Sequence, residues 1–250
     1  MTAQSWLCAL ALTWVCLPAY AAPVVGQGTW EATLHARDIN RDGVVDGYFD
    51  SSLGVTWLAD WNAAGPMNWY QSKSWAATLD VFGVRGWRLP TSLDTGASGC
   101  DLSPAGGTDC GYNPSTASSE LAHMFYITLG NLARCAPGDG NCDNGEQIAW
   151  GLSNTANFAN VQRYYFAGAE FIPDPNAPSP GLAWSFYAYD GFQGAMGQHT
   201  AIWAVAVRDG EIQPVSEPAA VNLLLSVGVL AMLGLLRRRR LSCHPTLHRV

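Results

Sequence analysis

The sequence predicts an α+β fold on an exported domain, with one transmembrane helix near the C-terminal end. Three observations lead to this prediction. Two segments carry apolar side chains at helical spacing, and several short runs rich in β-branched and aromatic residues lie between turns. Long apolar stretches stand near both ends of the 250 residues. We therefore expect two helices and several short strands between two membrane-directed segments.

Residues 1–21 are typical of a secretory signal peptide. The apolar stretch 6–17 is followed by Pro18 and by Ala19-Tyr20-Ala21, which has the small-x-small pattern of a cleavage site. The alternative is an uncleaved anchor, although the apolar stretch is short for a bilayer span. The domain that remains after cleavage would run from 22 to 212.

A second apolar segment, 219–236, is long enough to cross a bilayer as a helix. It is followed by Arg237, Arg238, Arg239 and Arg240, which would hold the tail 237–250 in the cytoplasm. Residues 213–218 form a linker that ends in Glu217 and Pro218. The order of short acidic-proline motif, helix and basic cluster resembles the PEP-CTERM sorting signal, which implies processing by an exosortase-like enzyme. A plain single-pass anchor is the alternative.

The charge of the exported part limits its partners. Between residues 22 and 218 lie all 20 acidic residues and 13 − 5 = 8 of the basic ones, so the net charge is 8 − 20 = −12. A strongly acidic surface excludes nucleic acid and disfavours polyanionic glycans, which need basic faces. Divalent cations and neutral polymers remain compatible with it.

Four cysteines lie in the exported part, namely Cys100, Cys110, Cys135 and Cys142. An even number in an oxidising compartment predicts disulfides. Of the three possible pairings, the short loops favour Cys100 with Cys110 and Cys135 with Cys142. A zinc site is the alternative, but the chain has no C-x-x-C motif.

The first helix is predicted over 69–80, because Asn68 and Gln71 have the spacing of a capping box. The second is predicted over 119–133, with Ser118 as its cap and one apolar face. Pro90 disfavours helix in the segment between them. Strands are expected at 29–37, 53–60, 162–167, 183–189 and 201–208.

The stretch "DINRDGVVDGYFD" (38–50) has oxygen-bearing residues at every second position and Gly43 where an EF-hand loop must turn. It predicts a calcium site, because hard cations bind carboxylate and carbonyl oxygens. Phe49 stands where an EF-hand places its closing glutamate, so Asp50 is expected to replace that ligand. The alternative is a solvated polar turn. The predicted ligands are Asp38, Asn40, Asp42, the Val44 carbonyl, Asp46 and Asp50.

Aromatic side chains suggest a second kind of site. Trp61, Tyr112 and Tyr187 are candidates for exposed rings that stack on a ligand, while Trp57, Trp69, Trp75 and Trp87 are expected in the core. Arg88, next to Trp87 and before Pro90, is expected to pair with Glu120. No nucleophile elbow or phosphate-binding loop occurs in the sequence, so an enzyme is not expected.

One family shares several of these segments. "GVTWLADWNAAGPMNWYQSKSWAATLDVFGVRGWRLPT", "SSELAHMFYITLGNLA", "RYYFAGAEF" and "IWAVAVRDGE" resemble the Lcl C-terminal-like domain family, from about residue 38 to 211. The Arg-Leu-Pro-Thr segment is also similar to that of formylglycine-generating-enzyme-like domains. The resemblance implies a C-type-lectin-like fold, in which two helices flank a small twisted antiparallel sheet with long disulfide-stapled loops.

These features predict a non-enzymatic recognition domain that is exported through the inner membrane to the cell surface or matrix and binds a polysaccharide or matrix component. Two alternatives remain open. The chain could be a structural envelope protein without a discrete ligand, or an extracellular hydrolase, since two of its many carboxylates could meet in space.

Overall fold

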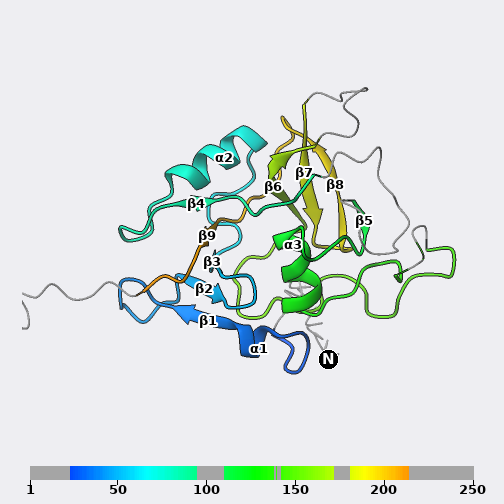
Figure 1. Ribbon diagram of the computed structural model, residues 1–250, viewed down its shortest axis with the longest axis horizontal. Helices are drawn as coiled ribbons and strands as arrows, with labels where there is room; N and C mark the ends of the chain where they lie inside the picture. Colours follow the sequence, from blue (N-terminus) through cyan, green and yellow to red (C-terminus); the bar gives the residue numbers. More distant parts are fainter. Residues whose placement is uncertain (1–22, 95–109, 138, 140–141, 172–180, 214–250) are drawn as a thin grey trace, which may run out of the picture.

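The computed structural model describes residues 23–94, 110–137, 139, 142–171 and 181–213. This part of the chain combines a few short helices with two antiparallel sheets, which confirms the α+β prediction (Figure 1). The helices are α1 (Trp30–Thr33), α2 (Trp69–Thr78) and α3 (Glu120–His123), and α3 continues as the π-helical turn η1 (Met124–Thr128).

The first sheet has the strand order β1-β2-β3-β9-β4 and the second has the order β5-β8-β7-β6. The bounds are β1 (Leu34–Arg37), β2 (Gly47–Asp50), β3 (Val55–Leu58), β9 (Val207–Asp209) and β4 (Trp87–Arg88) in the first sheet, and β5 (Gly111–Tyr112), β8 (Phe192–Gly197), β7 (Leu182–Tyr187) and β6 (Tyr164–Glu170) in the second.

Helix α2 begins at the predicted capping box. The Asn68 side-chain oxygen accepts from the Gln71 N–H at 2.9 Å, and the Gln71 side-chain oxygen accepts from the Asn68 N–H at 3.1 Å. Ser72 and Ala76 are buried, as the predicted inner face requires. The helix ends at Thr78, two residues before the predicted end.

The second predicted helix is shorter than expected. Its cap is Ser119 and not Ser118, because the Ser119 hydroxyl accepts from the Ala122 N–H. The helical segment stops at Thr128, since Gly130 has a left-handed φ of 66° and its Cα hydrogen lies against the backbone of Gly28. A Cβ on Gly130 would stand 2.4 Å from the Gly28 nitrogen, so only glycine fits this crossing.

Several strand predictions are corrected. Residues 30–33 form α1, so only the second half of the predicted strand 29–37 is extended. In the predicted strand 201–208, only β9 is regular. The preceding segment joins the two sheets, because the Trp203 carbonyl accepts from Phe166 N–H on β6 and the Ala206 carbonyl accepts from Leu58 N–H on β3. Strands β2, β4, β5 and β8 were not predicted.

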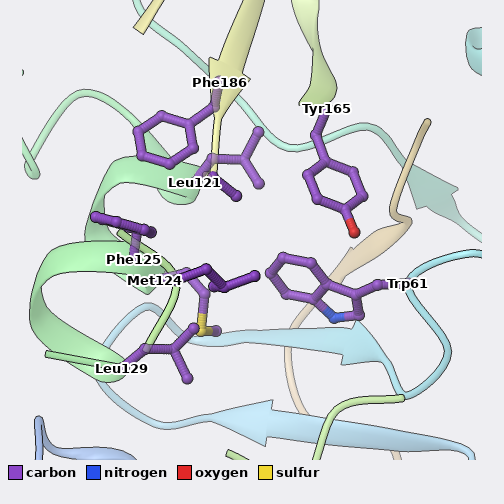
Figure 2. Close-up of a pocket in the computed structure, with 9 residues that line it drawn as sticks. Trp61, Leu121, Met124, Phe125, Leu129, Tyr165 and Phe186 are labelled. Atoms are coloured by element: carbon purple, nitrogen blue, oxygen red, sulfur yellow. The ribbon is translucent and has the colours of Figure 1, made fainter. Parts of the chain in front are cut away.

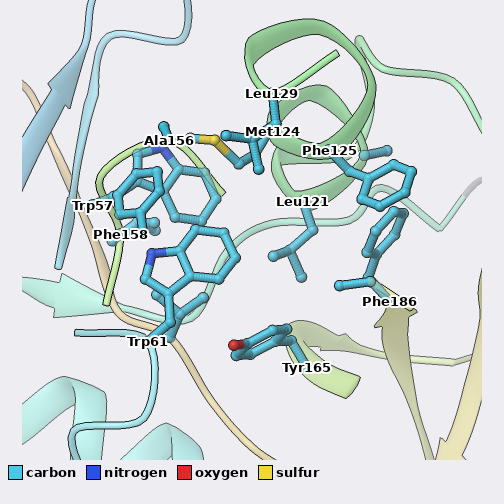
Figure 3. Packing of buried hydrophobic residues seen from close by; sticks show 14 of the residues in the cluster. Trp57, Trp61, Leu121, Met124, Phe125, Leu129, Ala156, Phe158, Tyr165 and Phe186 are labelled. Carbon is cyan, nitrogen blue, oxygen red and sulfur yellow. The ribbon is translucent and has the colours of Figure 1, made fainter. Parts of the chain in front are cut away.

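The main core lies between α3–η1, the inner strands of the first sheet and one face of the second sheet (Figure 3). Trp57 and Trp61 stack there with ring centroids 5.3 Å apart, and Tyr165 meets Trp61 edge-on at 5.2 Å. A second cluster packs under α2 and includes Trp69 and Trp87. The predicted core positions of Trp57, Trp69 and Trp87 are confirmed, whereas Trp75 is only partly buried.

Cys135 and Cys142 form a disulfide, with Cα atoms 4.8 Å apart. Cys110 is also disulfide-bonded, and its predicted partner Cys100 lies outside the described residues. Among the described residues, no helix is both long and apolar enough to span a membrane. The predicted signal peptide and the predicted transmembrane segment 219–236 lie outside them.

Candidate functional site

A row of aromatic rings crosses one face of the second sheet. Each strand contributes one ring, and the register pairs Tyr112 with Phe192, Phe192 with Tyr187, and Tyr187 with Tyr164. The ring centroids are 5.1, 5.4 and 5.1 Å apart in that order. Tyr189 joins the row from the β7–β8 turn, 5.4 Å from Tyr164. We call these five residues the aromatic ladder.

The ladder rings lie close against the sheet. A Cβ on Gly194 would stand 2.6 Å from the Phe192 ring, so the Phe192 ring covers the backbone of Gly194. The Tyr187 hydroxyl donates to the Ala195 carbonyl at 3.4 Å, which draws that ring over β8. All five ladder side chains are half-buried. One side of each ring is therefore packed while part of it stays open to solvent.

Asp190, in the β7–β8 turn, interacts with several residues of the ladder. Its carboxylate accepts from the Phe192 N–H at 3.1 Å and from the Tyr112 hydroxyl at 3.4 Å, and it interacts electrostatically with the nearby Tyr189 hydroxyl. Burial raises the pKa of Asp190 above its ordinary value, although these donors oppose the shift. Burial also raises the pKa values of Tyr112, Tyr187 and Tyr189, whose hydroxyls are protonated at neutral pH even at the ordinary tyrosine pKa of about 10.

Two of the three predicted stacking residues, Tyr112 and Tyr187, belong to the ladder. Trp61 does not, because it is only 3% exposed and packs in the main core. Figure 2 shows Trp61 among the side chains around a narrow apolar gap beside α3. The gap has a volume of about 10 Å³, which is the size of a single water molecule and too small for an organic ligand.

Tyr164, Tyr189 and Phe192 were not predicted. A local signal for part of the set exists in "FYAYDGF" (186–192), where aromatic residues flank an Asp-Gly pair that favours a hairpin turn. Gly191 has a φ of 79° in that turn. Pairing of Tyr164 and Tyr112 with this hairpin depends on contacts between distant segments, which the sequence pattern does not contain.

The acidic loop keeps most of its predicted ligands in one turn. The Asp38 carboxylate accepts from the backbone N–H groups of Asp42 and Gly43, and Asn40 donates to Asp42 at 2.8 Å. Asp46 reaches back to accept from the Ile39 N–H at 2.7 Å. Within the described chain, no three acidic, histidine or cysteine side chains converge to hold a metal ion. The donor set therefore fits calcium only in part.

Asp50 lies away from this loop. It follows Asp46 by the length of β2, roughly 13 Å for an extended strand. Its side chain is fully buried and accepts from the Ser52 N–H and the Thr128 hydroxyl. The predicted role of Asp50 as the closing calcium ligand is wrong, because its oxygens are committed to tying β2 to η1.

A weaker oxygen-rich loop follows Cys135. The Asp139 carboxylate accepts from the N–H groups of Asp143 and Asn144 at 2.6 and 2.8 Å. These bonds tie the Cys135–Cys142 disulfide loop, which contains the buried Asp139, to the two residues that follow Cys142. We assign this loop a structural role.

Arg88 and Glu120 form the expected pair. The guanidinium donates to both Glu120 oxygens at 2.8 Å, and Glu120 also accepts from the Thr91 N–H at 2.7 Å. Arg88 makes a further ion pair with the exposed Asp209. Pro90 is buried beside this network, and its carbonyl accepts from Gly168 N–H on β6. The predicted structural group therefore links β4, α3 and the second sheet.

Ser52 and His123 approach each other, with Ser52 Oγ 3.0 Å from His123 Nε2. The Ser52 hydroxyl has Asp50 as its acceptor at 2.5 Å. Because its proton points to Asp50, the serine offers an oxygen lone pair to the histidine and is not activated as a nucleophile. We interpret this trio as a tie between the loop after β2 and α3.

The predicted sorting residues Glu217, Pro218, Arg237, Arg238, Arg239 and Arg240 lie outside the described residues. No family model, curated protein or solved structure matches this chain. The resemblance to the Lcl C-terminal-like domain family thus stays a prediction from the quoted segments.

Proposed function

We propose that this chain is an exported, surface-anchored recognition domain that binds a neutral polysaccharide along the aromatic ladder. The observation that carries the proposal is the unbroken row Tyr112–Phe192–Tyr187–Tyr164 across all four strands of the second sheet. Aromatic faces bind the apolar C–H faces of sugar rings, and tyrosine hydroxyls can bond to sugar hydroxyls.

The dimensions of the ladder suit an extended ligand. Neighbouring strands lie about 4.8 Å apart, so a row that crosses three strand intervals is roughly 14 Å long. A single small molecule would use only part of that length. A chain of linked sugars could lie across the strands and meet successive rings.

The polar groups at the ladder favour an uncharged ligand. Asp190 is buried and sits beside the hydroxyls of Tyr112 and Tyr189. Arg134, whose charge acts on Tyr112, is paired with Glu146. With a net charge of −12 between residues 22 and 218, the domain would repel polyanions. The ligand is therefore proposed to be a neutral glycan.

The finer features of the chain belong to the same proposal. We place it among C-type-lectin-like folds by its resemblance to the Lcl C-terminal-like family. Export by the signal 1–21 and anchoring by the segment 219–236, with exosortase-like processing near Glu217 and Pro218, would present the ladder outside the cell. Calcium is proposed as a stabiliser of the acidic loop, held by Asp38, Asn40, Asp42 and Asp46 with the Val44 carbonyl.

A glycan array tests the proposal. The full chain is solubilised in a polyoxyethylene detergent, because a sugar-headed detergent would compete for the ladder. Binding is measured with and without millimolar calcium for the wild type, for Y187A and for Y70A. Tyr70 is a suitable control because it is 49% exposed, on α2, and outside the ladder.

We expect signals on neutral glycans that are clearly weaker for Y187A and unchanged for Y70A. Absence of any glycan signal would favour the alternative of a structural envelope protein without a discrete ligand. The third possibility, a hydrolase, would appear as release of new reducing ends from a bound glycan. Either result would overturn the proposal of a non-enzymatic recognition domain.

A further inference from the structure

A second hollow lies beside α1, and none of the residues that line it belongs to the aromatic ladder. The hollow has a volume of about 320 Å³, within the range of small-molecule sites. Its lining comes from α1, β1, β2 and the segment after Thr155, and consists of Trp30, Glu31, Leu34, Tyr48, Ala156 and Asn157.

The aromatic walls of this hollow have their polar atoms already occupied. The Trp30 indole N–H donates to the Val24 carbonyl at 3.2 Å, and the Tyr48 hydroxyl donates to the Asn157 carbonyl at 3.3 Å. Each bond fixes the ring and removes its only strong donor. What the two side chains offer to a ligand is therefore the electron-rich ring itself.

Glu31 supplies the charge. One of its oxygens, Oε2, accepts from the Gly26 N–H at 2.8 Å, which holds the carboxylate at the hollow. Among the described residues, Glu31 has no ion-pair partner, and its Oε1 has no hydrogen-bond donor. The hollow thus combines one anion without a countercharge with two aromatic side chains.

We infer that this hollow binds an organic ammonium group carried on a small apolar body. Aromatic rings and a carboxylate together attract such a cation, because the ring quadrupole and the negative charge act in the same direction. A metal ion would need more oxygen ligands than one carboxylate provides. An anion would be repelled, and a purely apolar ligand would strip water from Glu31 without compensation.

Isothermal titration with choline chloride tests this inference on the full chain in a non-ionic detergent. The matched control ligand is 3,3-dimethyl-1-butanol, which has the shape of choline without its charge, and sodium chloride controls for ionic strength. We expect saturable heat with choline alone. No saturable heat with choline, or equal binding of the neutral analogue, would overturn the inference.

Two variants assign the binding to the hollow. E31Q keeps an oxygen for the Gly26 N–H but removes the charge, so we expect at least a ten-fold loss of choline affinity. W30L should abolish binding, with circular dichroism to verify its fold. E170Q, an exposed glutamate on β6, should bind like the wild type. If W30L fails to fold, the choline affinity of E31Q tests the inference by itself. Unchanged choline affinity in E31Q would contradict the inference.

Discussion

Adjacent aromatic residues in β6 and β7 have opposite environments. Tyr165 and Phe186 are 0% and 1% exposed and face α3 in the main core, whereas Tyr164 and Tyr187 are half-buried in the ladder on the other face. Alternation along a strand decides this, because successive side chains point to opposite faces. The position of a residue in these strands, odd or even, therefore decides whether its ring packs in the main core or joins the ladder that we propose as the binding surface.

The largest expected effect comes from the core side of this comparison. F186A removes a ring that packs against Phe125 at a centroid distance of 5.4 Å. Deleting a buried phenylalanine costs about 3–5 kcal/mol of unfolding free energy. Chemical denaturation should show this loss. A loss below about 1 kcal/mol would mean that the core side of the sheet is not tightly packed.

The acidic loop extends the comparison to a region held by hydrogen bonds to its own backbone. A few millimolar calcium should stabilise the wild type by about 1–2 kcal/mol, since extracellular sites of modest affinity gain this much by mass action. D42A should remove that gain. Thermal melting with calcium or with a chelator measures it. If the melting temperature of the wild type were the same with calcium and with the chelator, the loop would be a polar turn that does not bind calcium.

The ladder side should show a smaller stability effect and a larger binding effect. Y187A exposes part of β8 and should cost only about 1 kcal/mol of unfolding free energy. Its affinity for the glycan should fall about ten-fold, because an aromatic contact contributes roughly 0.5–1.5 kcal/mol and 1.4 kcal/mol is a factor of ten. Denaturation and titration on the same sample separate the two effects. If Y187A and F186A lost the same unfolding free energy, the two faces of the sheet would not differ in packing, and the account would be contradicted.

The smallest effect concerns pH. Burial raises the pKa of Asp190 in the folded chain, so the folded state binds this proton more tightly than the unfolded state. Asp190 therefore lowers stability as the pH rises from about 4, its unfolded value, through its folded pKa. D190N should flatten that part of the stability profile. Denaturation at a series of pH values measures the slope, and identical slopes would show that Asp190 titrates normally.

Local features of the fold were predictable and long-range ones were not. The capping box at Asn68 fixed the start of α2, because both of its bonds are made within four residues. The end of the second helix was missed although Gly130 marks it, since the close approach of Gly28 is a contact between distant segments. Asp50 was misplaced for a similar reason, because β2 was not recognised as a strand and its buried partner Thr128 lies 78 residues away.

The candidate site shows the same division. Tyr112 and Tyr187 were selected as separate aromatic residues, but nothing in the pattern indicated that Phe192 joins them. Trp61 was predicted to be an exposed stacking ring, and this prediction is wrong. Strand order places it in the core, where Trp57 and Tyr165 cover it. Sequence spacing thus suggested candidate rings, while sheet register decides which rings form a surface.

Hydroxyl-radical footprinting of the full chain tests the central claim most directly. The chain is oxidised with and without the neutral polysaccharide that gives the strongest array signal, and modification of each tyrosine is measured by mass spectrometry. We predict that the polysaccharide protects Tyr164, Tyr187 and Tyr189 and leaves Tyr70 unchanged. Unchanged oxidation of the ladder tyrosines in the presence of a bound polysaccharide would contradict the claim that the ladder is the binding site.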